Sequence, residues 1–118
     1  MNRADDVLLD DIATAITSIR SHLRHGPISV EIVMDAVAMR LLEIGEAVKA
    51  LSAEVTATEP EIKWREIAGM RDFLAHRYFA TSPDMVQAVI DKDLQPLADA
   101  VARMRSRLPE GFGAADDD

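Results

Sequence analysis

Several things are scarce or absent in this sequence of 118 residues, and each narrows what the protein can be. It has no cysteine, which excludes disulfides, thiolate zinc sites and thiol nucleophiles and is compatible with a reducing cytosol. The longest stretch without Asp, Glu, Lys or Arg is eight residues, Ile12 to Ile19, too short to span a membrane. No basic region followed by an apolar run stands near the N-terminus, so no secretory signal is expected. We therefore expect a cytoplasmic protein with no membrane partner.

A basic charge balance is also absent, because the net charge is −8. A protein of this charge does not coat a nucleic-acid duplex, since phosphate binding depends mainly on Lys and Arg. The acidity lies mostly near the two ends, whereas residues 61–80 carry four cations against three anions. The charge is therefore compatible with an enzyme that contacts a few phosphates. It is equally compatible with a surface that binds a basic partner protein.

What is present is a helical pattern along nearly the whole chain. The length suits one domain with a substantial core, and apolar residues recur at three- and four-residue intervals without strand-like alternation. The spacing predicts helices over residues 4–24, 29–52, 64–78 and 84–108. Ser29 is expected to cap the second helix, and residues 53–61 are expected to form a polar connection.

Pro96 lies inside the last helical run. Proline removes a backbone donor and its ring clashes with the carbonyl one turn earlier, so this helix should be kinked or split there. The expected fold class is an all-α bundle of four main helices. Residues 1–110 should form this domain, and residues 111–118 an acidic, disordered tail.

The second helix carries apolar residues around most of its circumference, which is typical of a central helix or of one that contacts a second subunit. Gly45 lies inside it and costs about 1 kcal/mol relative to alanine. We expect this glycine to allow close packing of another helix. In the third helix, Trp64 is in phase with Ile67 and is expected to anchor the core.

The most informative segment, Ile62 to Phe79, holds Arg71, His76 and Tyr78 within eight residues. Arginine is a permanent cation suited to phosphate, and histidine transfers protons near neutral pH. On one helix Arg71 and Tyr78 share a face about 10 Å apart, whereas His76 lies about 140° round the axis from Arg71. Convergence of Arg71 and His76 on one phosphate requires a bend, the long reach of arginine, or a second subunit. We favour reach combined with a second subunit.

Each of these side chains also has an ordinary structural role. A histidine near a helix C-terminus can satisfy carbonyls, and Tyr78 can be a core phenol with one hydrogen bond. Arg71 can pair with Asp72 or Glu46 as part of the scaffold. Glu46 is ordinarily solvated, and its use in orienting Arg71 is the weaker alternative. On the spacing alone, these structural roles outweigh the functional one.

The flanking residues change that balance. They are Ile44-Gly45-Glu46-Ala47, Ile62-Lys63-Trp64-Arg65, Gly69-Met70, Asp93-Leu94 and Pro96-Leu97, around the motif Arg71-x4-His76-x-Tyr78. In order and spacing, nearly the whole chain resembles the HEPN superfamily and, within it, the HepT-like toxins of prokaryotic toxin–antitoxin pairs. The resemblance implies a HEPN-like helical homodimer that cleaves RNA as a metal-independent endoribonuclease without a cofactor. It implies Arg71 and His76 as the catalytic residues.

The resemblance also implies a protein partner, a cognate nucleotidyltransferase antitoxin that AMPylates the motif tyrosine, Tyr78. An adenylyl group there would block RNA by its bulk and its negative charge. Two positions depart from the family pattern. Asp72 stands where asparagine is frequent and can either orient Arg71 or repel a phosphate. Arg77 stands where an acidic residue is frequent and favours RNA. Glu46, Asp72 and Arg77 are the expected supporting residues.

Two other functions are compatible with the sequence. A non-catalytic helical interaction module would bind a partner protein through the apolar second helix and the acidic surface. A metal-dependent nuclease is a weaker alternative, because no carboxylate cluster of the needed kind surrounds the motif.

Overall fold

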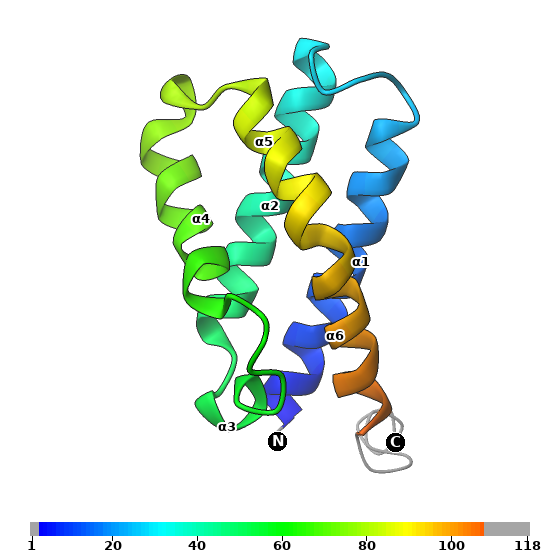
Figure 1. The fold of residues 1–118 in the computed structure, drawn as a ribbon, viewed down its shortest axis with the longest axis vertical. Coiled ribbons are helices and arrows are strands. Elements are labelled where there is room, and N and C mark those ends of the chain that lie inside the picture. The colour runs from blue at the N-terminus through cyan, green and yellow to red at the C-terminus, as the bar shows by residue number, and fades with distance from the viewer. Residues whose placement is uncertain (1–2, 108–118) are drawn as a thin grey trace.

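The computed structural model describes residues 3–107, and every regular element in that range is a helix (Figure 1). The elements are α1 (Arg3–Leu23), α2 (Glu31–Ala50), α3 (Ala53–Thr56), α4 (Trp64–Arg77), the 3-10 turn η1 (Tyr78–Ala80), α5 (Pro83–Val89), the π-helical turn η2 (Ile90–Leu94) and α6 (Gln95–Ser106). This confirms the expected all-α bundle. None of the helices in the described range is long and apolar enough to cross a bilayer.

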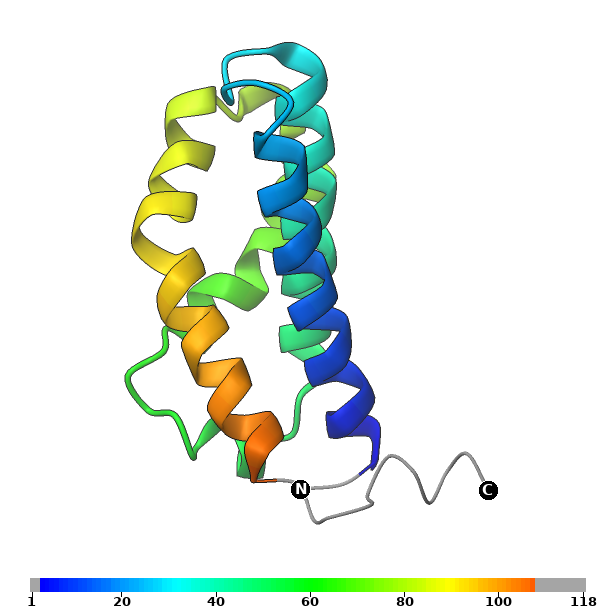
Figure 2. The ribbon, with the colours of Figure 1, turned by 90° about the vertical axis from the view of Figure 1, so that its right-hand side faces the viewer.

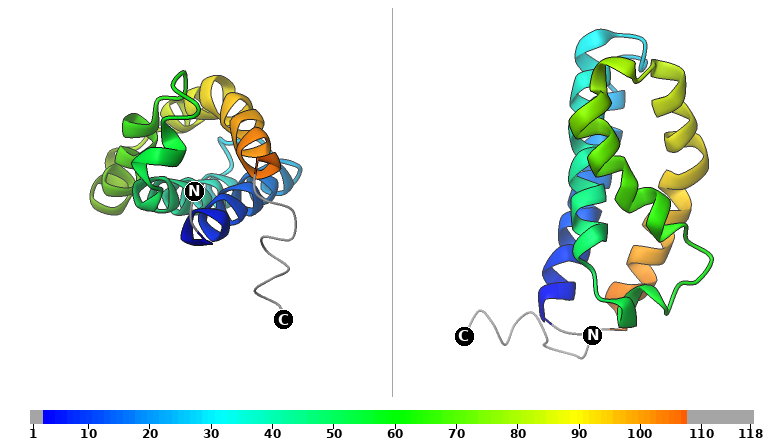
Figure 3. Two further views of the ribbon diagram at one scale, coloured as in Figure 1. Left: turned by 90° about the horizontal axis from the view of Figure 1, so that it is seen from below. Right: turned by 90° about the vertical axis from the view of Figure 1, so that its left-hand side faces the viewer.

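α2 is the central helix of one side of the bundle, packed against α1 on one flank and α4 on the other (Figures 1 and 3). α5, η2 and α6 form one curved run across the opposite side, where α6 packs on α1 (Figure 2). The core lies between these two sides. Its fully buried apolar side chains are Leu9, Ile12, Ile19, Val37, Ile44, Val55, Val101 and Met104. The broad apolar surface of α2 is thus explained by its central position.

The last helical run, which was predicted to be kinked or split at Pro96, is continuous and changes its helix geometry just before this proline. This proline is the second residue of α6, and the turn before it, η2, is π-helical. Pro96 cannot donate to the carbonyl of Lys92, and its ring crowds that carbonyl. A widened π turn accommodates both effects without ending the helical run.

Two segments differ from the sequence-based predictions. α2 begins at Glu31 with Val30 as its N-cap, and not after Ser29, because residues 27–30 form a turn in which the Val30 N–H donates to the Pro27 carbonyl at 3.0 Å. The connection over residues 53–61 contains a short helix, α3, whose N-cap Ser52 accepts from the Val55 N–H at 3.3 Å. A helix of four residues is too short to show a hydrophobic period.

Smaller predictions have mixed outcomes. In α1, Leu9 is fully buried and the neighbouring Leu8 is partly buried. Trp64 packs against the core as expected, and its indole N–H donates to the Glu59 carbonyl at 2.9 Å. The buried Glu59 carboxylate accepts from Arg103 at 2.7 Å, which ties the α3–α4 connection to α6. The predicted acidic tail, residues 111–118, lies outside the described residues.

Gly45 allows α2 and α4 to approach each other at the motif. A methyl group at this position would lie 2.8 Å from the backbone nitrogen of Arg71 and 3.0 Å from the carbonyl oxygen of Ile67. Those distances are too short for a carbon atom, so the two backbones can meet this closely only at a glycine. The predicted close contact is confirmed, and it lies directly against Arg71.

Candidate functional site

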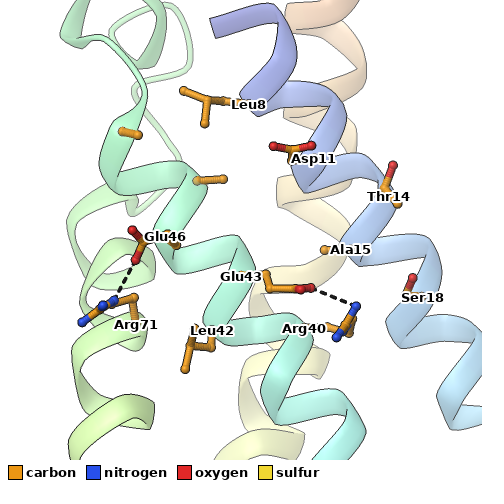
Figure 4. Close-up of a pocket in the computed structure, with 12 residues that line it drawn as sticks. Leu8, Asp11, Thr14, Ala15, Ser18, Arg40, Leu42, Glu43, Glu46 and Arg71 are labelled. Atoms are coloured by element: carbon orange, nitrogen blue, oxygen red, sulfur yellow. Dashed lines mark hydrogen bonds and ion pairs between the residues drawn. The ribbon is translucent and has the colours of Figure 1, made fainter. Parts of the chain in front are cut away.

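Arg71 lies on α4 beside α2, and two carboxylates hold its guanidinium. Figure 4 shows the contact with one of them, Glu46. Its Nε donates to Oε2 of Glu46 at 2.7 Å, and its Nη1 donates to Oδ1 of Asp72 at 3.1 Å. The hydrogen bond to Glu46, followed by the one to Asp72, raises the pKa of Arg71 above its ordinary value. Glu46 therefore contacts Arg71 directly, while its own side chain stays 61% exposed.

Arg71 borders an open cavity of about 710 Å³ on the α1–α2 face (Figure 4). The lining side chains from α1 and α2 include Leu8, Asp11, Thr14, Ser18, Leu42 and Ala47. The second cation of this cavity, Arg40, pairs with Glu43 at 3.0 Å. Its Nε is buried and has no hydrogen-bond partner within the described residues. Glu43 therefore serves Arg40, and Glu46 alone of these two glutamates serves Arg71.

Tyr78 begins η1, directly after α4, and contacts α2 as well. Its hydroxyl donates a hydrogen bond to Oδ1 of Asp35. This hydrogen bond, then burial, then the charges of Asp35 and Glu31, raise the pKa of Tyr78 from 10.0 to about 12. A cavity of about 280 Å³ lies beside the phenol, and Leu42 lines both this cavity and the larger one beside Arg71. Arg71 and Tyr78 thus line two cavities along α2 that have Leu42 in common.

His76 is exposed on α4 and is not brought to Arg71. α4 is α-helical through Arg77, and in a regular helix residues 71 and 76 are offset by about 140° round the axis. No hydrogen bond or ion pair to the His76 side chain is found within residues 3–107. Arg77 is also exposed, at the last turn of α4. One chain therefore places Arg71 and Tyr78 against α2 and leaves His76 facing outward.

Asp35 is the site residue that the sequence analysis missed. It is 43 positions from Tyr78, and no local pattern links residues so far apart. A weak signal was present, because Asp35 is the one charged residue between Glu31 and Arg40 in an otherwise apolar segment. Among the residues that the structure describes, no three His, Asp or Glu side chains are grouped so that they could hold a metal ion.

Large apolar side chains are exposed on α2, η1 and α5. They are Ile32 (76% exposed), Met39 (50%), Phe79 (102%) and Met85 (45%). Phe79 directly follows the motif.

The chain is similar in sequence to one family of ribonucleases. The family described as Ribonuclease HepT-like matches residues 12–104. A candidate ribonuclease HepT of Thermococcus cleftensis is 33% identical over 109 residues, which cover 89% of this chain and 99% of that protein. No solved structure matches the chain significantly.

Two further relatives match over shorter segments. A Methanocaldococcus jannaschii protein, named as a gamma-glutamylcyclotransferase and candidate RNase, is 35% identical over 74 residues, which cover 63% of this chain and 33% of that protein. A candidate RNase of Caldanaerobacter subterraneus subsp. tengcongensis is 43% identical over 60 residues, covering 50% and 54%. The matched part therefore spans about a third of the first protein and about half of the second.

Proposed function

Since the chain belongs to the HepT-like ribonuclease family, we propose that it is a metal-independent endoribonuclease and the toxin of a toxin–antitoxin pair. We assign Arg71 and His76 as its catalytic residues. The observation that carries this proposal is the placement of Arg71 at the edge of an open cavity. Its side chain is 37% exposed and is held in one direction by Glu46. A fixed, accessible cation is what a phosphodiester substrate requires.

The chemistry follows from the side chains. His76 takes the proton of an RNA 2′-hydroxyl, whose oxygen attacks the adjacent phosphorus and forms a cyclic phosphate. A second histidine protonates the leaving 5′-oxygen. Proton transfer of this kind typically contributes about 10² to 10⁴ in rate. Arg71 stabilises the charge that develops on the phosphoryl oxygens, an effect typically worth about 3 kcal/mol or more.

We propose that the working enzyme is a homodimer. A single chain leaves His76 and Arg71 on different sides of α4. The long side chain of Arg71 does not extend toward His76, because it is hydrogen-bonded to Glu46. A second subunit packed on the exposed side of α4 can supply its own His76 to the cleft that Arg71 borders. The exposed Phe79 and Met39 offer apolar surface for that contact.

We further propose that a cognate nucleotidyltransferase antitoxin silences the enzyme by AMPylation of Tyr78. The phenol borders a cavity that adjoins the one beside Arg71, with Leu42 common to both. An adenylyl phosphate on Tyr78 would occupy this region and compete for the Arg71 cation. RNA would be excluded both by bulk and by charge repulsion.

The test incubates purified protein with total cellular RNA in the presence of a chelator, beside Arg71→Ala and His76→Ala. The intact mass of each sample is recorded. Cleavage by the wild type alone, with both variants still folded, is the expected result. Cleavage that persists in both variants would contradict the assignment of Arg71 and His76 as catalytic residues. An inactive wild type that carries one adenylyl group on Tyr78 would be the silenced form, and removal of that group should then restore cleavage.

A second candidate is a non-catalytic interaction module. It is favoured by the two carboxylates that already pair with the Arg71 guanidinium and by the exposed Phe79 and Ile32. This function predicts that unmodified protein does not cleave RNA. It also predicts that His76→Ala leaves partner binding unchanged.

A further inference from the structure

The Tyr78 hydroxyl makes its hydrogen bond to a carboxylate on a different element. Asp35 belongs to α2 and Tyr78 to η1, so the folded core brings the two groups together. The other residues that line the cavity beside the phenol, Ala38, Met39, Leu42 and Leu74, have no titratable group. Within that cavity, the Asp35 carboxylate is the group that can accept a proton from the phenol.

We propose that Asp35 is the general base for adenylylation of Tyr78. It orients the phenol and takes its proton while the phenolic oxygen attacks the α-phosphorus of ATP. A bond forms between that oxygen and the α-phosphorus, and the bond from the α-phosphorus to its bridging oxygen breaks. Pyrophosphate leaves with the electron pair, and the proton passes from Asp35 to water. This inference rests on the proposed function, because it takes Tyr78 as the modified residue.

The need for a base follows from the state of the phenol. A tyrosine hydroxyl is almost fully protonated at neutral pH even at its ordinary pKa of about 10. Here the hydrogen bond to Asp35 raises the pKa of Tyr78 to about 12. Free tyrosinate is thus scarcer than in an ordinary tyrosine, and the proton must leave during the attack. A group already in hydrogen-bond contact is placed to receive it.

The surrounding charges provide a matched control. Glu31 lies one turn before Asp35 on α2, and its charge also acts on Tyr78, but it makes no hydrogen bond to the phenol within the described residues. The α4 residue that lines the cavity, Leu74, is apolar. Asp35 and Glu31 are therefore the two charged groups whose effects on Tyr78 must be separated. Asp35 is exposed, so water can remove its proton after each transfer.

The test measures the reaction of Tyr78 with adenosine 5′-phosphorimidazolide, an activated AMP donor that forms the same tyrosine adduct without a second protein. Tyr78 is the only tyrosine in the chain, so peptide mass locates the adduct, and Tyr78→Phe gives the background. At neutral pH, Asp35→Asn should react at about one tenth of the wild-type rate or below. Asp35→Glu should recover part of the rate, and Glu31→Gln should stay within about twofold of the wild type.

The pH profile separates a base from a structural support. Above pH 10, Asp35→Asn should overtake the wild type, because its phenol ionises earlier and reacts as tyrosinate. Equal rates of the two proteins at neutral pH would overturn the proposal. A variant slower than the wild type by one constant factor at every pH would also overturn it, since that result indicates structural support only.

RNA cleavage by the wild-type preparation is measured in parallel. Reactivity that depends on Asp35 without any RNA cleavage would defeat the proposed ribonuclease and leave the role of Asp35 standing. RNA cleavage together with reactivity that is independent of Asp35 would defeat the role of Asp35 alone.

Discussion

At the scale of single residues, the cation that should meet RNA is already engaged. Glu46 holds Nε of Arg71, while Asp72 holds Nη1, one of the two terminal nitrogens that would face a phosphate. A substrate phosphate must therefore displace Asp72 and can leave the Glu46 contact intact. We infer that Glu46 is a positioning residue and that Asp72 competes with the substrate.

Asp72→Asn should therefore increase RNA cleavage. The substitution keeps the size of the side chain and removes the charge that competes for Arg71. The Arg71–Asp72 ion pair is exposed, so its loss should change the cleavage rate about two- to fivefold. Glu46→Gln is the matched control and should lower the rate, because Arg71 loses the charged group that directs it. Initial rates on one RNA substrate compare the three proteins. A slower Asp72→Asn enzyme would show that Asp72 orients Arg71.

Tyr78 should titrate late, and the presence of one tyrosine makes its titration measurable by ultraviolet absorbance. The wild-type midpoint is expected at about pH 12. Asp35→Asn should move it toward 10, because the carboxylate that accepts the hydrogen bond and repels the phenolate is gone. A midpoint in the variant as high as in the wild type would assign the raised pKa to burial.

The same titration has a consequence for stability. The folded pKa of Tyr78 lies above its ordinary value of 10.0, so the stability it contributes is fully present below pH 10. That contribution is lost as the pH rises toward about 12. The difference in unfolding free energy between wild type and Asp35→Asn should narrow over this interval, as denaturant titrations at several pH values would show.

At the scale of secondary-structure elements, two glycines have opposite surroundings. A methyl group added at Gly45 would collide with the backbone of α4 at Arg71, whereas one added at Gly69 would meet nothing within 4 Å. The first glycine sets the distance between α2 and α4. The second has no packing role within the described residues and is an exposed position inside α4.

Gly45→Ala should therefore lower the free energy of unfolding by about 1 to 3 kcal/mol, because α4 must move away from α2. It should also reduce RNA cleavage, since the displaced backbone carries Arg71. Gly69→Ala is the matched control and should raise the free energy of unfolding by about 0.5 to 1 kcal/mol through helix propensity. Urea unfolding measures both. A Gly45→Ala protein as stable as the wild type would contradict the close contact.

At the scale of the whole molecule, the position of His76 leads to a prediction about assembly. Arg71 packs toward α2, while His76 is exposed on α4. A site that uses both residues is completed most simply by two chains.

Mixing Arg71→Ala with His76→Ala protein should therefore restore part of the cleavage activity. Each mixed dimer combines an intact arginine from one chain with an intact histidine from the other. The mixture is exchanged under mild denaturant and assayed beside each variant alone, with sedimentation to establish the dimer. Dimers that mix but stay inactive would show that both residues act within one chain.

Much of this protein was predictable from local patterns. The helical spacing and the change of helix geometry near Pro96 both appear in the structure. The errors were also local, such as the start of α2 and the short α3, where a turn or a single capping bond overrides the periodic pattern. The motif around Arg71, and the family that it indicates, could also be recognised in the sequence, because the residues of the motif stand at a fixed spacing within eight positions.

The helices, the bundle and the residues of the motif could be predicted from the sequence, since helix periodicity, capping and proline act over a few neighbouring positions. Which of those residues contact each other depends on how the helices pack. The contacts of Arg71 with Glu46 and of Tyr78 with Asp35 join α4 and η1 to α2. Such contacts depend on how closely two helices cross, and here that distance is set by the absence of a side chain at Gly45.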